Sequence, residues 1–312
     1  MDLNSLIYFA EAAKDLNFTQ TAKRLFISQQ NLSSQIARLE EHYGVKLFER
    51  RPRLSLTYAG EVLLAHANQM RISEDNLKNV LADIKEKERG SLRIGCSPSR
   101  SSIVMPILAE QFACQYPNVE LHFHHYHSNI LTKMLLDGEL DFAVCIDKVS
   151  HPSLVSRKLF TDRIYLMAAD ALLRRHYPDS ADELIFRSRQ GAHIRDFMQL
   201  PFSNTHSSNV TADFFQSENC HPKFTITSNY PQFFLPFYFQ NAAASIITKT
   251  VYLSVRPFLA EDIHVFPLIT GPSFHITDIS FTRHKRKYLS QYGQHFLKIA
   301  EAYFQQLEAC PD

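Results

Sequence analysis

Residues 28–44 read SQQNLSSQIARLEEHYG, and this stretch determines how the first sixty residues fold. Leu32, Ile36 and Leu39 recur at the spacing of one helix face, which predicts an amphipathic helix. A merely solvated face usually carries lysine and glutamate, but the opposite face here carries amides, hydroxyls and one arginine: Gln29, Gln30, Ser33, Ser34, Gln35 and Arg38. Such a face indicates a partner with hydrogen-bonding groups of its own.

Two predicted helices precede this one. Apolar residues at helical spacing indicate a helix over residues 3–14, and either Asn17 or Thr19 can cap a second helix. After a short break, Ser28 can cap the quoted helix and Gly44 can end it. Two helices joined by a few residues, the second with an uncommitted polar face, are typical of a helix-turn-helix.

The segment after Gly44 reads VKLFERRPRLSLT and predicts a small hairpin, or wing. Two short apolar pieces flank its tip, where Pro52 fits a turn better than a central strand. Arg50, Arg51 and Arg53 at the tip suit a phosphate backbone, while glutamine and arginine on the helix can pair with adenine and guanine edges. The alternative is a solubilising helix face beside a chance arginine cluster, and the combination of helix and wing argues against it.

Residues 18–60 carry the pattern of a known family. They resemble the N-terminal domain of the LysR-type transcriptional regulators through these residues: Phe18, Ala22, Leu25, Ser28, Gln29, Ser33, Ile36, Leu39, Glu40, Gly44, Leu47, Phe48, Arg50, Leu56, Thr57 and Gly60. The resemblance implies an all-α winged helix-turn-helix domain over residues 1–58. Its expected DNA-contacting residues are Thr19, Gln29, Gln30, Ser33, Ser34, Gln35, Arg38, Arg50, Arg51 and Arg53.

A long helix capped by Thr57 is expected from Tyr58 to Glu88, because that segment lacks proline and has no glycine beyond its first turn. Its apolar residues recur in heptads that Glu74 interrupts: Leu63, Ala67, Met70, Leu77, Leu81 and Ile84. This spacing predicts a linker over residues 59–89 that pairs with a second copy. The alternative is a helix packed on its own domain. The family resemblance also implies a dimerising linker helix, in a homodimer or homotetramer.

Strand-like and helical segments alternate from residue 90 onward, which predicts a mostly parallel sheet with ligands at the carboxyl ends of its strands. The alternation occurs in two runs, so we expect an α/β domain of two lobes over residues 90–312. The first lobe should comprise about 91–162 and 269–312, and the second about 163–268. The family resemblance implies the same periplasmic-binding-protein-like architecture.

Two segments of this domain carry more specific expectations. Residues 230–241 (YPQFFLPFYFQN) predict an unusually aromatic helix in the second lobe. Family members usually carry a glycine-rich phrase before the next strand, where this chain has Asn241, Ala242 and Ala244. The last helix is expected to start at Tyr288 and to complete the first lobe.

The segment CSPSRSS follows the first predicted strand of this domain and opens a helix. A helix N-terminus offers unpaired N–H groups to an anion, and hydroxyls and an arginine lie beside it here. An ordinary serine cap would explain the same residues, but their place at a strand end favours a binding site. The expected effector is a small polar or anionic metabolite, held by Ser97, Ser99, Arg100, Ser101, Ser203, Asn204, Thr205, Thr227 and Ser228.

The composition is that of a globular chain, with 45% hydrophobic and 21% charged residues. Because the net charge is +1, any affinity for nucleic acid must come from a local basic patch. The N-terminus has no signal-peptide pattern, and no run approaches the roughly 18 apolar residues of a spanning helix. Five scattered cysteines without a CxxC motif fit a reducing compartment. We therefore expect a cytoplasmic protein without membrane contact.

Other chemistry has less support in the sequence. No GxSxG, Walker, GxGxxG or HExxH motif occurs, so we expect no catalytic residues, no metal and no cofactor. His122 and His124 share a strand face, as do His125 and His127, but without a further ligand at clear spacing a partly exposed strand is favoured. Cys96 is a candidate redox sensor, although a buried thiol is the favoured interpretation.

The sequence therefore predicts a DNA-binding transcriptional regulator that is controlled by a small-molecule effector and acts as an activator. Its expected partners are double-stranded promoter DNA, a second copy of itself and RNA polymerase. One rival is a solute-binding-type carrier, which would have a signal peptide and no basic reading head. The other is an enzyme on the same two-lobed fold, which would need a catalytic constellation in the cleft.

Overall fold

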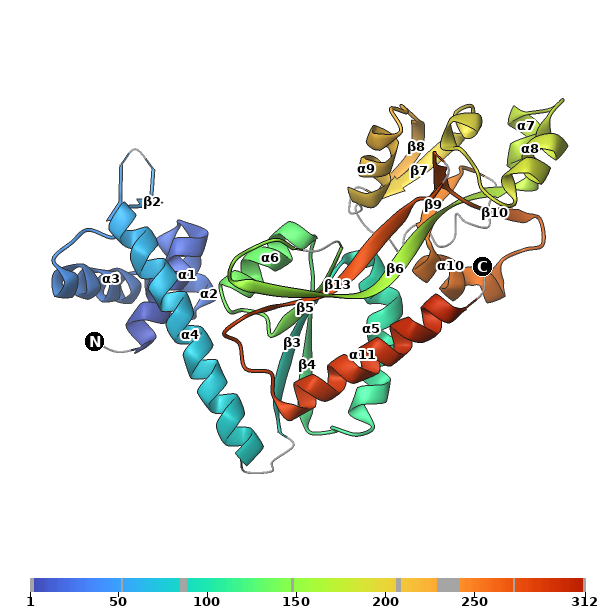
Figure 1. Ribbon diagram of the computed structural model, residues 1–312. Coiled ribbons are helices and arrows are strands. Elements are labelled where there is room, and N and C mark those ends of the chain that lie inside the picture. Colours follow the sequence, from blue (N-terminus) through green and yellow to red (C-terminus); the bar gives the residue numbers. More distant parts are fainter. Residues whose placement is uncertain are drawn as a thin grey trace.

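A helical head, a long connecting helix and a two-lobed α/β part follow one another along the chain (Figure 1). The computed structural model describes residues 3–51, 53–84, 89–146, 149–205, 209–228, 242–271 and 273–310. The predicted aromatic helix over residues 230–241 lies outside the described residues. So do Pro52 at the tip of the wing and the last four residues predicted for the linker helix, 85–88.

The head combines helices with a two-stranded wing, as predicted. Its elements are α1 (Leu3–Asp15), α2 (Phe18–Arg24), α3 (Gln29–Tyr43), β1 (Phe48–Glu49) and β2 (Ser55–Leu56). Asn17 caps α2 by accepting from the N–H of Gln20 at 3.1 Å, which settles the choice between Asn17 and Thr19. Ser28 caps α3, and Gly44 ends it in the left-handed conformation at φ 68°. Apolar side chains from these elements share one core.

The long helix α4 (Tyr58–Ile84) begins against the wing. Thr57 caps it, since its hydroxyl oxygen accepts from the N–H of Gly60 at 3.0 Å. Gly60 permits a close approach, because a Cβ at this position would overlap the carbonyl oxygen of Leu47. The first turn of α4 is therefore fixed to the head.

The apolar seam of α4 divides into two parts. Leu63 and Ala67 are buried in the core of the head. Leu77, Leu81 and Ile84, by contrast, are 54%, 47% and 70% exposed. The prediction of a seam that meets a second copy along its whole length is wrong for the first half, where the helix packs on its own chain. The C-terminal turns keep an exposed apolar stripe.

Strands with helices on their faces build both lobes, as the alternating pattern predicts. The first lobe contains β3 (Gly90–Cys96), α5 (Pro98–Ala113), β4 (Val119–His125), α6 (Ser128–Leu136), β5 (Phe142–Ile146), β13 (Ile276–His284) and α11 (Gln291–Ala309). The second contains α7 (Asp170–His176), α8 (Ala181–Ser188), η1 (Ile194–Phe197), β7 (Pro201–Thr205), α9 (Asn209–Ser217), β8 (Lys223–Ser228), β9 (Ser245–Thr248), α10 (Lys249–Val255), η4 (Arg256–Phe258), β10 (Ile263–Pro267), β11 (Ile269–Thr270) and β12 (Ser273–Phe274). Each lobe has its own hydrophobic core.

One long strand, β6 (Leu154–Ala169), belongs to both lobes (Figure 1). Its first part pairs antiparallel with β13, and its second part pairs antiparallel with β9 and β10. The strands therefore follow the order β10-β6-β13-β5-β3-β4, and β9 pairs with β6 beside this path. The prediction of a mostly parallel sheet is wrong here, because β6 pairs antiparallel with β13, β9 and β10, and β13 pairs antiparallel with β5. In the first lobe β3 runs parallel to β4 and β5, so the carboxyl ends of these three strands lie at one edge.

The loop between β13 and α11 holds the second half of α4, and we call residues 285–290 the linker clamp. Asn76 of α4 accepts from the backbone N–H of Tyr288 at 2.7 Å. The Lys287 ammonium pairs with Asp75 of α4 at 2.8 Å, and only 1% of the Lys287 side chain is exposed. Because Tyr288 lies in this clamp, α11 starts at Gln291 and not at the predicted Tyr288.

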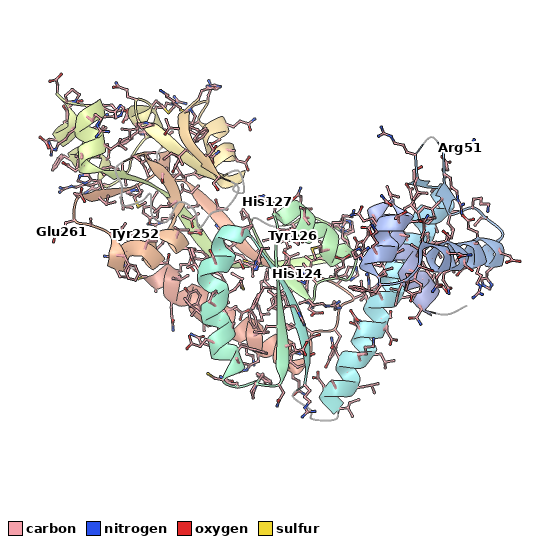
Figure 2. All side chains as sticks on the ribbon, turned by 180° about the vertical axis from the view of Figure 1, so that it is seen from behind. Arg51, His124, Tyr126, His127, Tyr252 and Glu261 are labelled. Atoms are coloured by element: carbon pink, nitrogen blue, oxygen red, sulfur yellow. The ribbon has the colours of Figure 1, made fainter. Side chains whose placement is uncertain are left out.

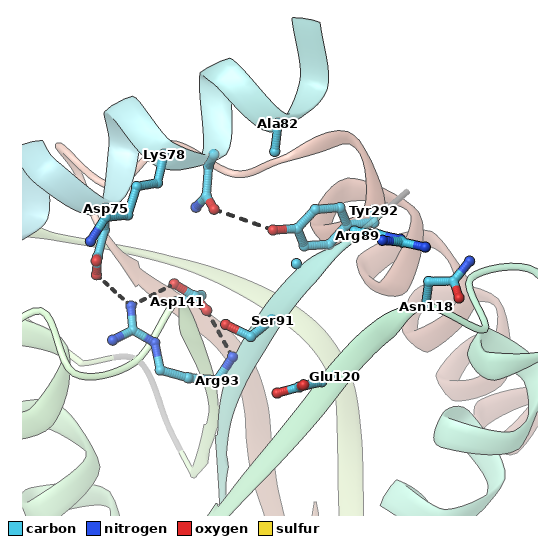
Figure 3. A pocket seen from close by; sticks show the side chains of 12 residues that line it. Asp75, Lys78, Ala82, Arg89, Ser91, Arg93, Asn118, Glu120, Asp141 and Tyr292 are labelled. Atoms are coloured by element: carbon cyan, nitrogen blue, oxygen red, sulfur yellow. Dashed lines mark hydrogen bonds and ion pairs between the residues drawn. The ribbon is translucent and has the colours of Figure 1, made fainter. Parts of the chain in front are cut away.

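A polar cavity of about 630 Å³ separates α4 from β3 (Figure 3). Arg93 of β3 bridges it, since its guanidinium pairs with Asp75 at 2.6 Å and with Asp141 at 3.2 Å. The Tyr292 hydroxyl donates to Asn79 of α4 at 3.2 Å. Cations and carboxylates thus occur together on the walls of this cavity and balance one another.

Candidate nucleic-acid interface and interlobe site

Helix α3 presents its polar face to solvent. Its apolar stripe is buried in the head, where Leu32, Ile36 and Leu39 are at most 2% exposed. Ser28 sets the start of the helix by accepting from the N–H of Asn31 at 3.1 Å. The predicted reading residues on the other side are exposed or half-buried: Gln29, Gln30, Ser33, Ser34, Gln35 and Arg38.

Two of these side chains are oriented by hydrogen bonds within the head. The exposed Thr19 donates from its hydroxyl to the amide oxygen of Gln29 at 3.0 Å, which joins α2 to α3. The Ser5 hydroxyl donates to the amide oxygen of Gln35 at 2.8 Å, which joins α1 to α3. Both glutamines therefore keep their NH₂ groups for an acceptor outside the head.

The wing places its arginines beside the reading helix. Its strands pair antiparallel through Phe48 and Leu56. Arg50, Arg51 and Arg53 are exposed at its tip, and Arg51 points away from the body of the molecule (Figure 2). Within the part of the chain that the structure describes, these three arginines form no ion pair, so their guanidinium groups are available to phosphates.

Glu40 connects the reading helix to the wing and is 6% exposed. Its carboxylate accepts from the backbone N–H groups of Leu47 at 2.9 Å and Phe48 at 3.4 Å, and from the Lys46 ammonium at 2.7 Å. Burial alone would raise the pKa of Glu40, but these bonds outweigh burial and hold that pKa below its usual value. Lys46 is thereby engaged, so arginines make up the available basic patch.

We expect Glu40→Gln to destabilise the head by about 1.5–3 kcal/mol at neutral pH, since hydrogen bonds to charged groups contribute about that much. Because the folded pKa of Glu40 is lowered, its contribution is complete above the ordinary value of 4.5 and is lost as pH falls through the folded pKa. Thermal melts of wild type and variant should therefore differ less at about pH 3 than at about pH 7. An equal difference at both pH values would contradict this role.

The start of α5 supplies the side of the candidate effector site that belongs to the first lobe. Ser97 occupies the N-cap position, yet its hydroxyl makes no cap bond. The residue is 6% exposed, and its Oγ finds no hydrogen-bond partner among the described atoms. Ser101, in contrast, is bonded to Nδ1 of His125 at 2.6 Å. A buried, unpartnered hydroxyl at a helix N-terminus suits a polar group of a ligand.

Strand ends in the second lobe carry the other residues of the candidate effector site. β7 and β8 are parallel, and the N–H of Ser203 donates to the carbonyl of Ala244, just before β9, at 2.8 Å. Asn204 Oδ1 in β7 and Thr248 Oγ1 at the end of β9 are buried and lack a partner among the described atoms. Ser97, Asn204 and Thr248 thus lie at strand ends, where open α/β sheets bind ligands. We call these three residues the interlobe site.

Arg100 was predicted to offer its charge to the effector, and the structure corrects this. Arg100 is 3% exposed, and its Nε and Nη2 donate to Oδ2 of Asp162 at 3.2 and 3.0 Å. The fully buried Asp162 also accepts from the N–H and the hydroxyl of Thr250 at 3.1 and 2.9 Å. The charge of Arg100 is therefore balanced inside the protein, and this cluster joins α5, β6 and α10.

The other predicted effector residues lie in varied surroundings. Ser203 is buried and bonded to the hydroxyl of Ser245 at 2.6 Å, while Thr227 is exposed and Ser228 half-buried. The structure describes the backbone alone for Ser99 and Thr205. Thr248 was missed, although its place at the junction of a short strand and a helix is a recognisable signal for a site.

Cys96 lies in the core of the first lobe and is 1% exposed. Burial raises the pKa of its thiol to about 12, which suppresses the reactive thiolate. Among the residues that the structure describes, His, Cys, Asp and Glu side chains form no group of three suited to a metal ion. No described helix combines the length and apolar character needed to cross a membrane.

A winged helix-turn-helix head, a long helix and a two-lobed α/β part define a class of protein, namely a regulator that joins a DNA-reading domain to a ligand-binding domain. Two family models match this chain. One describes a bacterial regulatory helix-turn-helix protein of the lysR family and matches residues 3–61. The other describes the LysR substrate binding domain and matches residues 85–305. The chain therefore belongs to the LysR family of transcriptional regulators, which confirms the resemblance seen in the sequence.

Curated relatives support the same assignment. The regulator YtlI of Bacillus subtilis is 34% identical over 176 residues, which is 54% of this chain and 55% of YtlI. The regulator YwqM of the same organism is 33% identical over 218 residues, 67% of this chain and 73% of YwqM. The chain thus spans little more than half the length of the first of these relatives.

Solved structures of full-length LysR-type proteins share the fold. An OxyR variant from Pseudomonas aeruginosa has a TM-score of 0.68 at 18% identity, covering 100% of this chain and 99% of that one. CbnR in complex with its target DNA has a TM-score of 0.55 at 18% identity, covering 98% and 100%. This likeness confirms the predicted architecture of winged head, long helix and two lobes.

Proposed function

We propose that this chain binds double-stranded promoter DNA through α3 and the wing, and that a small molecule held between its lobes changes that binding. The observation that carries the proposal is the exposed polar face of α3 beside wing arginines that form no ion pair among the described residues. Glutamine and arginine on a helix can read base edges in the major groove. The wing arginines can hold phosphates and set the register of the helix on the duplex.

The functional unit in this proposal is a homodimer, alone or within a homotetramer. Leu77, Leu81 and Ile84 form an exposed apolar stripe on α4, and pairing with a second copy would cover it. A dimer also presents two reading heads to two half-sites of a pseudo-palindrome. The proposed organisation of the chain has three units: residues 1–58, 59–89 and 90–312.

The proposed effector is a small polar or anionic metabolite at the interlobe site. Ser97, Asn204 and Thr248 offer buried polar atoms that lack protein partners within the described structure. Because Asp162 neutralises Arg100, an anion at this site would be held by the N–H groups and the dipole of α5. The dipole is equivalent to roughly half a positive charge at the N-terminus of the helix. A ligand with one carboxylate and several hydroxyls therefore suits this site better than a multiply charged one.

The proposed role is activation of transcription in the cytoplasm, with RNA polymerase as a further partner. The names of the relatives YtlI and YwqM as regulators support regulation over catalysis. An enzyme on this fold would need an acid or a base to activate a nucleophile, and the hydroxyls of Ser97 and Thr248 have no such partner among the described atoms. Saturable turnover of a bound compound would favour the enzyme.

Footprinting on the DNA upstream of its own gene tests the proposed function, and we expect protection of one or two dyad sites. Arg51→Ala should weaken binding to specific and scrambled DNA alike and reduce the salt slope of log K by about 1, because one phosphate contact is lost. Lys223→Ala, at an exposed position of the second lobe, is the matched control and should leave the slope unchanged. Absent protection, or a slope that Arg51→Ala does not alter, would contradict the proposal.

A further inference from the structure

A second cavity lies in the first lobe and shares no lining residue with the interlobe site. It is formed by β6, β13, the linker clamp and the start of α11. Its volume is about 520 Å³, which falls within the size range of small-molecule sites. We call it the clamp cavity.

The floor of the clamp cavity is apolar. The register of β6 and β13 places Phe281 opposite Arg157 and Arg283 opposite Val155, so these four side chains share one face of the sheet. Phe281 is 5% exposed, and the half-buried Leu297 of α11 lines the cavity with it. This floor suits an aromatic ring or a short alkyl chain.

The rim of the clamp cavity is cationic. Arg157, Arg283, Lys285 and Lys287 line it, and no carboxylate lies among the lining residues that the structure describes. Lys285 is exposed, and neither Lys285 nor Arg283 forms an ion pair within the described part of the chain. Arg283 donates to the backbone carbonyls of Lys287 and His284 at 3.1 and 3.3 Å, which fixes its guanidinium at the cavity.

The other two cations are already neutralised. Lys287 pairs with Asp75 at 2.8 Å, and Arg157 pairs with Glu301 of α11. The positive charge that remains therefore belongs to Arg283 and Lys285, at the end of the cavity formed by the clamp. One anionic group of a ligand is the complement to this pair.

The polar cavity beside α4 lacks this character (Figure 3). Its described lining residues include three cations, Lys78, Arg89 and Arg93, and three carboxylates, Asp75, Glu120 and Asp141. Such balance gives no preference for an anion. An apolar floor beneath unbalanced cations distinguishes the clamp cavity from it.

We propose that the clamp cavity is a second small-molecule site that binds an apolar monocarboxylate, with its ring or alkyl chain on Phe281 and Leu297 and its carboxylate between Arg283 and Lys285. The site stands independently of the effector proposed between the lobes. Its ligand also contacts the segment that holds α4, because Lys287 and Tyr288 both line the cavity and bond to the linker helix. Occupancy therefore acts on the position of α4 without passing through the interlobe site.

The test is a ¹⁹F NMR titration of the full-length protein with 4-(trifluoromethyl)benzoate, and with 4-(trifluoromethyl)benzyl alcohol as the neutral analogue. The benzoate should bind and the alcohol should bind at least about tenfold more weakly, since it lacks the charge. Lys285→Glu reverses a rim charge, and Val155→Trp fills the cavity at a position that is 40% exposed. Each should weaken benzoate binding by about tenfold or more.

Two matched variants separate this site from other sources of binding. Lys223→Glu makes the same charge change on the second lobe, and Ser97→Ala alters the interlobe site. Both should leave the affinity for the benzoate within about twofold. Hydrogen exchange in residues 285–290 should slow when the benzoate is added. The proposal is overturned if no benzoate binding is detected, if the alcohol binds equally well, or if Lys285→Glu and Val155→Trp bind like wild type. Loss of binding in Ser97→Ala would place the benzoate between the lobes and equally overturn it.

Discussion

Replacing Gln29 and Arg38 together with alanine is expected to abolish sequence-specific DNA binding. Each base contact contributes on the order of 1–3 kcal/mol, so two lost contacts should weaken specific binding by roughly 30-fold to 20,000-fold. Both side chains are exposed, and the apolar stripe of α3 is untouched, so the head should stay folded. Binding to scrambled DNA should change far less, because the wing arginines remain in place.

Fluorescence anisotropy with a footprinted site and a scrambled duplex, at one fixed salt concentration, measures both affinities. Glu41→Ala is the matched control, because Glu41 is an exposed residue near the end of the same helix. It should retain the preference for the specific site. A double variant that still discriminates between the two duplexes would show that the polar face of α3 is not the reader.

Asp162→Ala is expected to be among the most damaging single changes in the α/β part. It leaves the Arg100 guanidinium, at 3% exposure, without a counter-charge, and it removes the acceptor of Thr250. Removing one partner of a buried ion pair typically costs about 3–5 kcal/mol. For a domain of this size that corresponds to a fall in Tm of about 6–20 °C, which calorimetry would detect.

A double variant separates the contribution of the two charges to stability from the contribution of side-chain packing. Arg100→Met with Asp162→Leu replaces both ions by apolar side chains of similar size, and such replacements are often nearly neutral. The double variant should therefore recover most of the stability lost in Asp162→Ala. A single variant as stable as wild type, or a double variant less stable than the single one, would refute the structural role of this pair.

Local rules were sufficient to predict the head from the sequence. The caps at Ser28 and Gly44, the apolar stripe of α3 and the arginine-tipped hairpin all follow from spacing and residue type within a few turns of chain. The lobes were predicted at the level of alternation, because strand and helix periods are also local signals.

Contacts between residues that lie far apart in the sequence explain the features that the sequence did not predict. Arg100 follows a helix start, and its neighbours in sequence do not indicate that Asp162, 62 residues away, will neutralise it. The first half of the α4 seam is buried by the head, and a heptad pattern does not distinguish an intrachain surface from a second copy. Tyr288 was assigned to the last helix because its contacts with α4 lie more than 200 residues away.

The continuity of β6 has a consequence for how the α/β part unfolds. Phe160 belongs to the core of the first lobe, while Ile164 and Leu166, a few residues further along the same strand, belong to the core of the second. Fraying of this strand in one lobe therefore removes side chains or backbone pairing from both. The two lobes should therefore melt as one cooperative unit. A contiguous fragment that ends before β13 would also lack a strand of the first lobe, since β13 returns to that lobe from the far end of the chain.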